Sequence, residues 1–295
     1  MQESTPSWQD LLGLDVDYYR DNQPDLAELS DAELIEHFNL HGRAEGRVGA
    51  KEALRAELVK TVSRYKSILE IGPFCNPCVT GSNVSYFDVL DSSGLQQRAK
   101  AIGYNTASVP DVEFVSPTGD LAIVDRKFDA VISSHCIEHQ PDLIAHLVQV
   151  QRILKEGGRY FMLIPDKRYC FDFALAESNV AQIVAAHRNG RKTHRIESVI
   201  EHRALTTHND TGRHWQGDHF DAGWEERIAK RTDAALAEFD AAGGGYIDVH
   251  AWQFTPKSFA SLVSQLRLMK LINLEVQDVY ETPKGRNEFT VILKK

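Results

Sequence analysis

The sequence has few cysteines, no long apolar run and no dense basic block, and each absence excludes a class of protein. Four cysteines in 295 residues are too few for a disulfide scaffold, so a reduced, cytoplasmic setting is the simpler expectation. The apolar runs fall well short of the ~18 residues of a transmembrane helix, and the first residues lack the profile of a signal peptide. A net charge of -9 without a basic cluster argues against a nucleic-acid partner.

What is present is an alternation of short β-rich runs and helical stretches from about residue 66 onward. This alternation predicts an α/β fold whose mainly parallel sheet is covered on both faces. The expected strands are 67–72, 84–88, 112–115, 128–134 and 159–165, and the expected helices include 142–158 and 255–272. The last two apolar runs, 273–280 and 288–295, are joined by a link so short that it suits an antiparallel hairpin.

Two regions depart from this pattern. Residues 1 to about 50 carry short helical patterns, one capped by Ser30, and predict a helical module ahead of a main domain at 51–295, which a helix over 50–65 introduces. Residues 166–252 fit neither the helical nor the strand period and hold most of the chain's histidines. We expect them to form an insertion after the fifth strand that lies over the carboxyl ends of the strands.

The ends of the first two predicted strands carry the residue types of a nucleoside site. Glu70 and Gly72 end the first strand, and ligands of open α/β sheets bind outside the carboxyl ends of the strands. Asp88 ends the second strand, where a carboxylate accepts hydrogen bonds from both hydroxyls of a ribose. The phosphate-binding pattern G-x-G-x-x-G is absent, and Pro73 and Pro77 leave few free N–H groups. A nucleoside without a pyrophosphate therefore fits better than NAD.

The runs ILEIGP, VSYFD and FDAVISSHCIEHQPDLIAHLVQVQRILKEGGRYFMLIPD together resemble a class I S-adenosylmethionine-dependent methyltransferase of the bacterial glycan-biosynthesis type. The resemblance extends from about residue 66 to 295. It implies a Rossmann-like sheet, S-adenosyl-L-methionine as cofactor and a saccharide or glycan acceptor. Pro73 and Asn76 replace two glycines of the family's first loop, which leaves the contacts to the methionine end of the cofactor open.

Carried onto this chain, the resemblance also implies a set of cofactor-binding residues. Asp88 would bind the ribose, and Asp120 with Leu121 would meet the adenine. The alternatives are a helix cap for Asp88 and an ordinary loop acid for Asp120. The full implied set is Glu70, Gly72, Pro73, Asp88, Asp120, Leu121, Ser134 and His135.

The stretch from His135 to His139 reads H-x-x-E-H, the zinc signature of inverted-motif metallopeptidases, which needs a helix. The residues before it are a predicted strand, and a helix can begin only near Asp142. We therefore expect a strand-to-helix loop, and the sequence offers no obvious third zinc ligand. In the resembling family this loop lines the cofactor pocket, which implies a structural Glu138 and makes His139 a candidate general base.

The insertion offers further candidates for catalysis and acceptor binding. A sugar hydroxyl needs a base during attack on a methyl group, and histidine suits this role near neutral pH. The rivals of His139 are His208, His214, His219 and His250. Trp215 and Trp252 are candidates to stack on a sugar ring. Asp166, Lys167 and Arg168 follow the fifth strand, where they would meet a phosphate or acidic sugar or remain solvated charges.

Two patterns suggest metal or redox sites. Asp210, Asp218 and His219 have the residue types of a divalent-metal site, without regular spacing. Cys75 and Cys78 form C-x-x-C, but no second pair completes a four-cysteine zinc site, and a redox motif would occupy the cofactor loop.

The N-terminal runs DYYRDNQPDL and HFNLHGRAEGR resemble a short helical module attached to bacterial glycosyltransferases and polysaccharide enzymes. This implies other glycan-assembly enzymes as partners, and the alternative is an arm that covers the main domain. The sequence thus predicts an O-methyltransferase acting on a sugar hydroxyl in surface polysaccharide assembly. A small-molecule or protein methyltransferase, and a non-catalytic docking module with the same fold, remain alternatives.

Overall fold

The computed structural model describes residues 12–295, and its centre is a seven-stranded sheet in the order β3-β2-β1-β4-β5-β7-β6. The strands are β1 (Ile68–Ile71), β2 (Val84–Asp88), β3 (Phe114–Val115), β4 (Phe128–Ser134), β5 (Leu154–Pro165), β6 (Glu275–Val279) and β7 (Glu288–Lys294). Neighbours among β1 to β5 are parallel, whereas β7 runs antiparallel to both β5 and β6. The predicted parallel sheet with a late antiparallel hairpin is confirmed.

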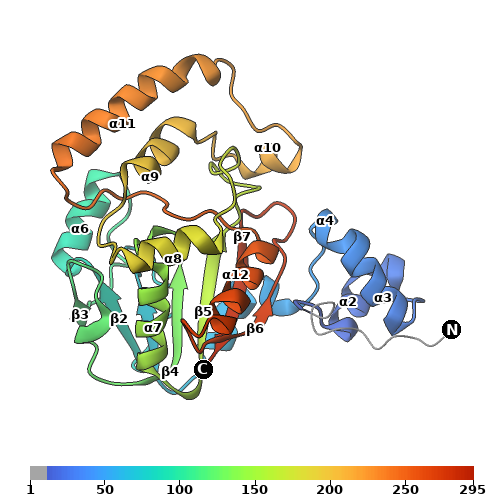
Figure 1. Cartoon of the computed structure of the whole chain (residues 1–295). Helices are drawn as coiled ribbons and strands as arrows, with labels where there is room; N and C mark the ends of the chain where they lie inside the picture. Colours follow the sequence, from blue (N-terminus) through green and yellow to red (C-terminus); the bar gives the residue numbers. More distant parts are fainter. Residues whose placement is uncertain (1–11) are drawn as a thin grey trace.

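Both faces of the sheet are buried under helices, because alternate residues of a strand point to opposite faces. Val131 and Met162 belong to a core covered by α7 (Leu143–Ile153), α8 (Val180–Arg188) and α12 (Pro256–Leu268). Ile132 and Phe161 belong to a second core under η3 (Lys51–Ala53) and α5 (Arg55–Val62). α6 (Ser92–Ala101) connects β2 to β3, and Figure 1 shows it at the β3 edge of the sheet.

Capping residues begin several helices where the sequence predicts them. Ser30 accepts a hydrogen bond from the backbone N–H of Glu33 and completes a capping box at α3 (Asp31–His37). Asp142 caps α7, and Thr255 with Pro256 begins α12. Because these caps satisfy N–H groups that have no partner inside the helix, the starts of these helices are encoded locally.

Two predicted helices are wrong in extent. α7 ends at Ile153 instead of reaching Gly158, because Leu154 already pairs with Phe128 in the sheet and is fully buried. The register shifts before Ala130 pairs with Arg159, and Gly157 takes a φ of 73° in the resulting bulge, a conformation that glycine adopts without strain. The helix predicted over 50–65 is divided at Leu54 into η3 and α5.

The insertion lies beyond the carboxyl ends of β4 and β5, where Figure 1 shows α9, α10 and α11 (yellow to orange). After α8 its elements are α9 (Ile196–Ile200), η6 (Glu201–Leu205), α10 (Thr211–Trp215), η7 (Glu225–Arg227) and α11 (Ile228–Ala242). Val199, Ala235, Ile247 and Val249 form its own small core. The middle of the insertion therefore has a core of its own, whereas α8 and the segment at 251–252 belong to the main core of the sheet.

The N-terminal helices also have a core of their own, formed by Tyr19, Leu26, Leu34 and Phe38. They comprise α2 (Val16–Asn22), η1 (Pro24–Leu26), α3, η2 (Phe38–Gly42) and α4 (Arg43–Glu45). Arg43 forms an ion pair of 3.6 Å with Glu281, and the Lys284 N–H donates to the Gly46 carbonyl, so this unit rests on the loop before β7. Residues 1–11 of the predicted module lie outside the described residues. Within residues 12–295 no helix has the length and apolar character needed to cross a membrane.

The buried His146 on α7 generates a prediction about stability and pH. Its Nε2 lies 3.1 Å from the Tyr160 hydroxyl, and burial lowers the pKa of His146 to about 4. As pH falls from about 6.5 toward 4, the unfolded chain takes up a proton that the folded chain does not, so the free energy of unfolding falls by up to about 1.4 kcal/mol per pH unit.

We expect His146→Leu to remove this contribution while Ser133 still hydrogen-bonds the Tyr160 hydroxyl. Between about pH 7 and pH 4.5, the variant should lose about 2 kcal/mol less unfolding free energy than the wild type. Chemical denaturation at the two pH values measures the difference. An identical pH dependence in both proteins would contradict a neutral, buried His146.

Candidate functional site

A cavity of about 380 Å³ opens at the carboxyl ends of β1, β2 and β4. Its walls come from the β1–β2 side, from α6, from the loop after β4 and from the returning end of the insertion. The lining residues are Ile71, Gly72, Phe74, Phe87, Asp88, Val89, Leu95, Arg98, Ile102, Gly119, His135, Cys136, His139, Gln140, His146, Tyr246 and Asp248. This is the edge of the sheet at which open α/β folds bind ligands.

Asp88 places a carboxylate of fixed orientation in the wall of the cavity. Its Oδ1 accepts hydrogen bonds from the backbone N–H groups of Val89 and Leu90, at 2.7 and 3.3 Å. Burial raises the pKa of Asp88, while these N–H groups act in the opposite direction. A carboxylate held in one orientation at the end of β2 is suited to receive the hydroxyls of a ribose.

Gly72 and Phe74 bring the backbone of the first loop to the cavity. Both have a positive φ, 70° at Gly72 and 46° at Phe74. Pro73 between them is buried and does not line the cavity. The loop thus approaches the cavity through a glycine and through an aromatic side chain that the sequence alone did not single out.

Glu70 faces away from the cavity. Its carboxylate accepts hydrogen bonds from the N–H groups of Cys78 and Val79, at 2.7 and 3.1 Å. Burial raises the pKa of Glu70 to about 7, although the two N–H groups pull it downward. Glu70 therefore holds the loop 73–79 against the sheet rather than lining the cavity.

The other residues predicted to contact a cofactor are distributed unevenly around the cavity. Asp120 caps η4 (Leu121–Ile123) and accepts a hydrogen bond from Gln149, while Leu121 is fully buried. Neither residue lines the cavity, but Gly119 beside them does. Ser134 accepts a hydrogen bond from Arg55 outside the cavity lining, and His135 lines the cavity.

The H-x-x-E-H residues lie in a loop after β4, as the sequence predicts. Only a single short turn, η5 (Ile137–His139), interrupts this loop before α7. His135 has a φ of 50°, a conformation rare for a residue with a side chain. The turn directs His135, Cys136 and His139 toward the cavity while Glu138 points into the protein.

His139 and Asp248 form an ion pair at the cavity. The His139 Nδ1 lies 3.0 Å from the Asp248 Oδ1, and Asp248 also pairs with Arg98 of α6. Burial acts to lower the pKa of His139, but Asp248 and Glu138 more than offset this, so the pKa is raised. Contact with His139 holds the pKa of Asp248 well below its usual range. The Arg98–Asp248 pair ties the insertion to α6 across the cavity.

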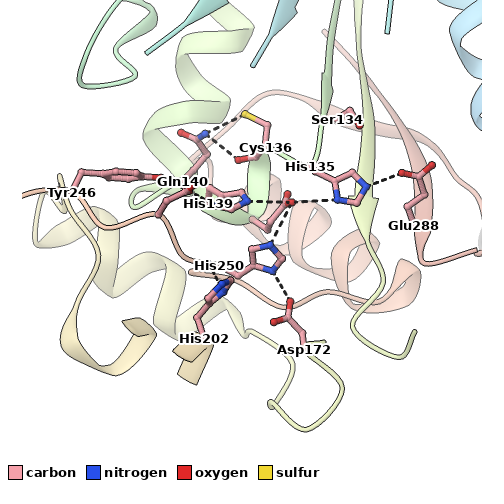
Figure 2. A network of polar contacts seen from close by, with 12 residues as sticks. Ser134, His135, Cys136, His139, Gln140, Asp172, His202, Tyr246, His250 and Glu288 are labelled. Carbon is pink, nitrogen blue, oxygen red and sulfur yellow. Dashed lines mark hydrogen bonds and ion pairs between the residues drawn. The ribbon is translucent and has the colours of Figure 1, made fainter. Parts of the chain in front are cut away.

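Glu138 is the most unusual group of the site. It is 1% exposed, and neither carboxylate oxygen has a hydrogen-bond partner in the described part of the chain. Three histidine nitrogens surround its Oε1: His139 Nε2 at 3.7 Å, His135 Nδ1 at 3.9 Å and His250 Nε2 at 3.9 Å. Figure 2 shows His135, His139 and His250 turned toward one central carboxylate. We call Glu138 and these three histidines the Glu138 cluster.

Each histidine of the Glu138 cluster approaches a second carboxylate with its other ring nitrogen, and Figure 2 shows this for His250 with Asp172 and for His135 with Glu288. The His250 Nδ1 lies 2.6 Å from the Asp172 Oδ2, and the His135 Nε2 lies 2.8 Å from the Glu288 Oε2. His139 has Asp248 in this position. These outer contacts fix the ring orientations and turn the inner nitrogens toward Glu138.

The charged residues predicted to bind an acceptor are already paired within the fold. Asp166 is fully buried and accepts hydrogen bonds from Arg168 and Thr282. Arg168 also pairs with Glu281, and the Lys167 Nζ donates to the Phe173 carbonyl. The structure therefore uses these three residues to connect β5 to the segments around it.

The two tryptophans predicted to stack on a sugar are also engaged. Trp215 stacks on Tyr169 with ring centroids 3.8 Å apart, and its Nε1 donates to the Arg286 carbonyl. Trp252 is buried and donates from Nε1 to the Gln140 carbonyl. His250 beside it is buried in the Glu138 cluster.

The remaining histidine candidates gather around α10, outside the cavity lining. The His214 Nε2 lies 2.9 Å from the His208 carbonyl, and its Nδ1 lies 2.9 Å from the His219 Nδ1. His219 stacks on Phe173. Asp210 caps α10, and Asp218 pairs with Arg213. The three predicted metal ligands Asp210, Asp218 and His219 are not among the groups of residues 12–295 whose ligand atoms converge.

Sequence reasoning missed Arg98, Asp172, Tyr246 and Asp248. Each is a common residue type in an unremarkable local pattern: Arg98 reaches the site from α6, and Asp172, Tyr246 and Asp248 reach it from the insertion. The cysteines of the C-x-x-C pair are both free. Burial raises the pKa of Cys78 to about 12, which does not favour a reactive thiolate.

Comparison with known proteins identifies the central part of the chain. Residues 78–162, from the loop before β2 into β5, match the family model described as a methyltransferase domain. Among curated proteins, none matches the chain.

Several solved methyltransferase structures are similar to the chain. CcbJ from Streptomyces caelestis is 17% identical over 42% of this chain and 55% of its own, with a TM-score of 0.29. The mitomycin 7-O-methyltransferase MmcR is 11% identical over 96% of this chain and 61% of its own (TM-score 0.39). The magnesium protoporphyrin IX methyltransferase ChlM from Synechocystis is 10% identical over 90% of this chain and all of its own (TM-score 0.37). The match to CcbJ spans only about half of CcbJ. With TM-scores this low, nothing about acceptor or mechanism follows from these similarities.

The position of Glu70 yields a prediction about the first loop. Glu70→Ala leaves the N–H groups of Cys78 and Val79 without their buried acceptor. We expect the free energy of unfolding to fall by about 1–3 kcal/mol, the usual consequence of leaving buried donors unpaired. Chemical denaturation measures the loss, with substitution of the exposed Glu36 by alanine as the control. Equal stability of the Glu70 variant and the wild type would show that Glu70 does not hold the loop.

Proposed function

We propose that the chain, whose residues 78–162 match a methyltransferase domain and whose sheet has the order β3-β2-β1-β4-β5-β7-β6, transfers a methyl group from S-adenosyl-L-methionine to a hydroxyl oxygen of a sugar-type acceptor. One observation carries the proposal: a single cavity is lined both by the fixed carboxylate of Asp88 and by the polar groups His139, Asp248 and Arg98. We call the lining around Asp88 the first wall and the lining around His139 and Asp248 the second wall. The first wall suits the nucleoside of the cofactor, and the second suits a polar acceptor.

The residues of the first wall fit S-adenosyl-L-methionine. Asp88 would accept hydrogen bonds from the ribose hydroxyls, since its orientation is already fixed by two backbone N–H groups. The apolar side chains Phe87, Leu95 and Ile102 line the same cavity and would cover the apolar faces of the nucleoside. When bound, the cofactor supplies an electrophilic methyl group on a sulfonium.

The residues of the second wall would orient the acceptor and exclude water. The Arg98–Asp248 pair connects α6 with the insertion, and Tyr246 lines the cavity beside it. An alcohol becomes a competent nucleophile only when its proton leaves during attack. His139 and the Glu138 cluster behind it place proton-accepting and charge-stabilising groups on this wall.

A sugar-type acceptor is the narrower part of the proposal. Two features support it: the polar character of the second wall, and the resemblance of residues up to about 50 to the module attached to polysaccharide enzymes. Acceptor binding would involve Arg98, Gln140 and Tyr246, because Asp166, Lys167 and Arg168 are engaged in internal contacts. A role in surface polysaccharide assembly, with other glycan-assembly enzymes as partners, would follow from the same two features.

The cofactor assignment is tested by removing the carboxylate of the first wall. Asp88→Ala should weaken S-adenosyl-L-methionine binding by about 1.5–3 kcal/mol, which is about 10- to 150-fold in Kd, the loss expected for hydrogen bonds to a charged partner. Isothermal titration calorimetry measures the affinity.

Glu113→Ala is the matched control, because this carboxylate lies just before β3 and pairs with Arg126 outside the cavity lining. Its affinity should equal that of the wild type. Unchanged affinity in Asp88→Ala would remove Asp88 from the cofactor site. Absence of binding heat in the wild type would favour the non-catalytic docking module.

The reaction is tested with purified protein, S-adenosyl-L-methionine and acceptors that offer hydroxyl, amine or carboxylate groups on related sugars. We expect a methyl ether on a sugar hydroxyl, identified by mass spectrometry and NMR, together with S-adenosylhomocysteine. His139→Ala should reduce turnover by about 10²–10⁴-fold while the cofactor Kd changes by less than about threefold. Methylation of the amine or carboxylate acceptors alone would reject the proposal.

A further inference from the structure

We propose that the Glu138 cluster is a binding site for a divalent transition-metal ion of the zinc type, with Glu138, His139 and His250 as its protein ligands. The inference deepens the proposed function and rests on it for the role of the ion, because the site borders the cavity in which the methyl group is transferred. The ion binding itself is argued from the cluster alone.

The first argument is the unpaired charge of Glu138. A carboxylate that is 1% exposed and has no hydrogen-bond partner on either oxygen costs several kcal/mol unless a cation compensates it. In the described part of the chain no lysine or arginine forms an ion pair with Glu138; only the three histidines of the cluster approach it. A divalent cation among these groups would remove the cost.

The second argument is the separation of the candidate ligand atoms. The His139 Nε2 and the His250 Nε2 lie 3.7 and 3.9 Å from the Glu138 Oε1, which is too far for hydrogen bonds. Ligand atoms around a tetrahedral ion at about 2.1 Å lie about 3.4 Å apart. The three ligand atoms are all within 4.8 Å of one another. Closing the site therefore takes shifts of a few tenths of an ångström at the two contacts to Glu138 and of up to about 1.4 Å between the two histidine nitrogens.

The third argument concerns the carboxylates that lie behind the histidines. Histidines that bind metals usually donate their other ring N–H to a carboxylate or carbonyl, which fixes the tautomer and orients the ring. Asp172 takes this place behind His250 through a hydrogen bond of 2.6 Å, whereas Asp248 forms an ion pair of 3.0 Å with the His139 Nδ1 without hydrogen-bond geometry. A cluster built only for packing would not need a carboxylate behind every histidine. The Glu138 carbonyl also accepts hydrogen bonds from the Ala251 and Trp252 N–H groups, which hold the segment carrying His250 against the turn.

A neighbouring group of possible ligands, Asp172, His202 and His250, is less suited to hold an ion. The Asp172 Oδ2 is already bonded to the His250 Nδ1, and the His202 Nδ1 already accepts from the His250 backbone N–H. These contacts place Asp172 and His202 behind His250, in the outer shell. The Glu138 cluster, by contrast, has its inner atoms unpaired.

The ligand types indicate the class of metal. Two imidazoles and one carboxylate suit Zn²⁺ and related first-row ions, and no thiolate belongs to the set. Three protein ligands leave a coordination position open, as in catalytic zinc sites. Of the three ligands only His139 lines the cavity, so the ion would meet the acceptor from the His139 side.

An ion at this place would give the site a Lewis acid for the acceptor hydroxyl. With the ion bound, His139 would serve as a ligand and not as the base: coordination would lower the pKa of the hydroxyl, and its proton would leave to water. The oxygen then forms a bond to the methyl carbon while the carbon–sulfur bond breaks, and that electron pair returns to sulfur to give the neutral thioether. No oxidant or reductant is needed.

The test is metal binding by purified protein, independent of activity. After stripping with a chelator, the wild type should bind one equivalent of Zn²⁺ in isothermal titration calorimetry and retain it after gel filtration, as measured by elemental analysis. Glu138→Gln and His250→Ala should weaken Zn²⁺ binding by at least 100-fold. Asp172→Asn, which changes only the outer shell, should weaken it by about 10–100-fold.

His214→Ala is the matched control, because His214 is another buried histidine but belongs to the group around α10. It should bind zinc like the wild type. S-adenosyl-L-methionine affinity is measured in each variant, so that a variant that fails to fold is recognised, and Asp172→Asn keeps the test valid if Glu138→Gln does not fold.

Less than half an equivalent of zinc in the wild type, or full binding by Glu138→Gln and His250→Ala, would overturn the inference. Loss of zinc only in His214→Ala would overturn it as well, in favour of the histidines around α10. Wild-type cofactor binding and hydroxyl methylation without zinc would reject the role of the ion in the reaction and leave the proposed function standing. Zinc binding without methylation of any hydroxyl would keep the metal site and reject the proposed function.

Discussion

The buried carboxylate of Glu138 is the constraint around which the site is organised. An ionised group without partners in the protein interior is costly, so its surroundings must compensate it. Here three histidines approach one oxygen, and each is held from behind by a further carboxylate. The loop after β4, the hairpin strand β7 and the returning insertion each contribute a residue to this arrangement. The loop after β4 and the insertion also line the cavity, so the cavity and the Glu138 cluster depend on the same two segments.

Much of the fold is predictable because its signals are local. The strand runs, the hairpin link and the caps at Ser30, Asp142 and Thr255 each depend on a few neighbouring residues, and the structure confirms them. The end of α7 is not predictable in this way. Leu154 leaves the helix because it pairs with Phe128, and a contact of that kind between distant segments is invisible in the helical pattern that continues to Gly158.

The site residues also divide into those that local sequence signals predict and those that depend on contacts between distant segments. Gly72, Asp88, His135 and His139 follow strand ends, and the rule that ligands bind there brings them to the cavity. Glu70 has the same kind of position, yet its side chain turns to the N–H groups of the first loop. The path of the insertion decides where Asp172 and Asp248 lie, and it also brings His250 to Glu138. The sequence showed that H-x-x-E-H is not a helical zinc motif, but it could not show that the fold supplies His250 from far along the chain.

A crystal structure of the protein with S-adenosylhomocysteine and one equivalent of zinc would test both the cofactor site and the metal site. Diffraction data are collected on both sides of the zinc absorption edge. The account predicts the ribose of the ligand on Asp88 and a single anomalous peak between Glu138, His139 and His250, open toward the cavity. A ligand bound away from Asp88, or an anomalous peak at α10 or none within the Glu138 cluster, would contradict it.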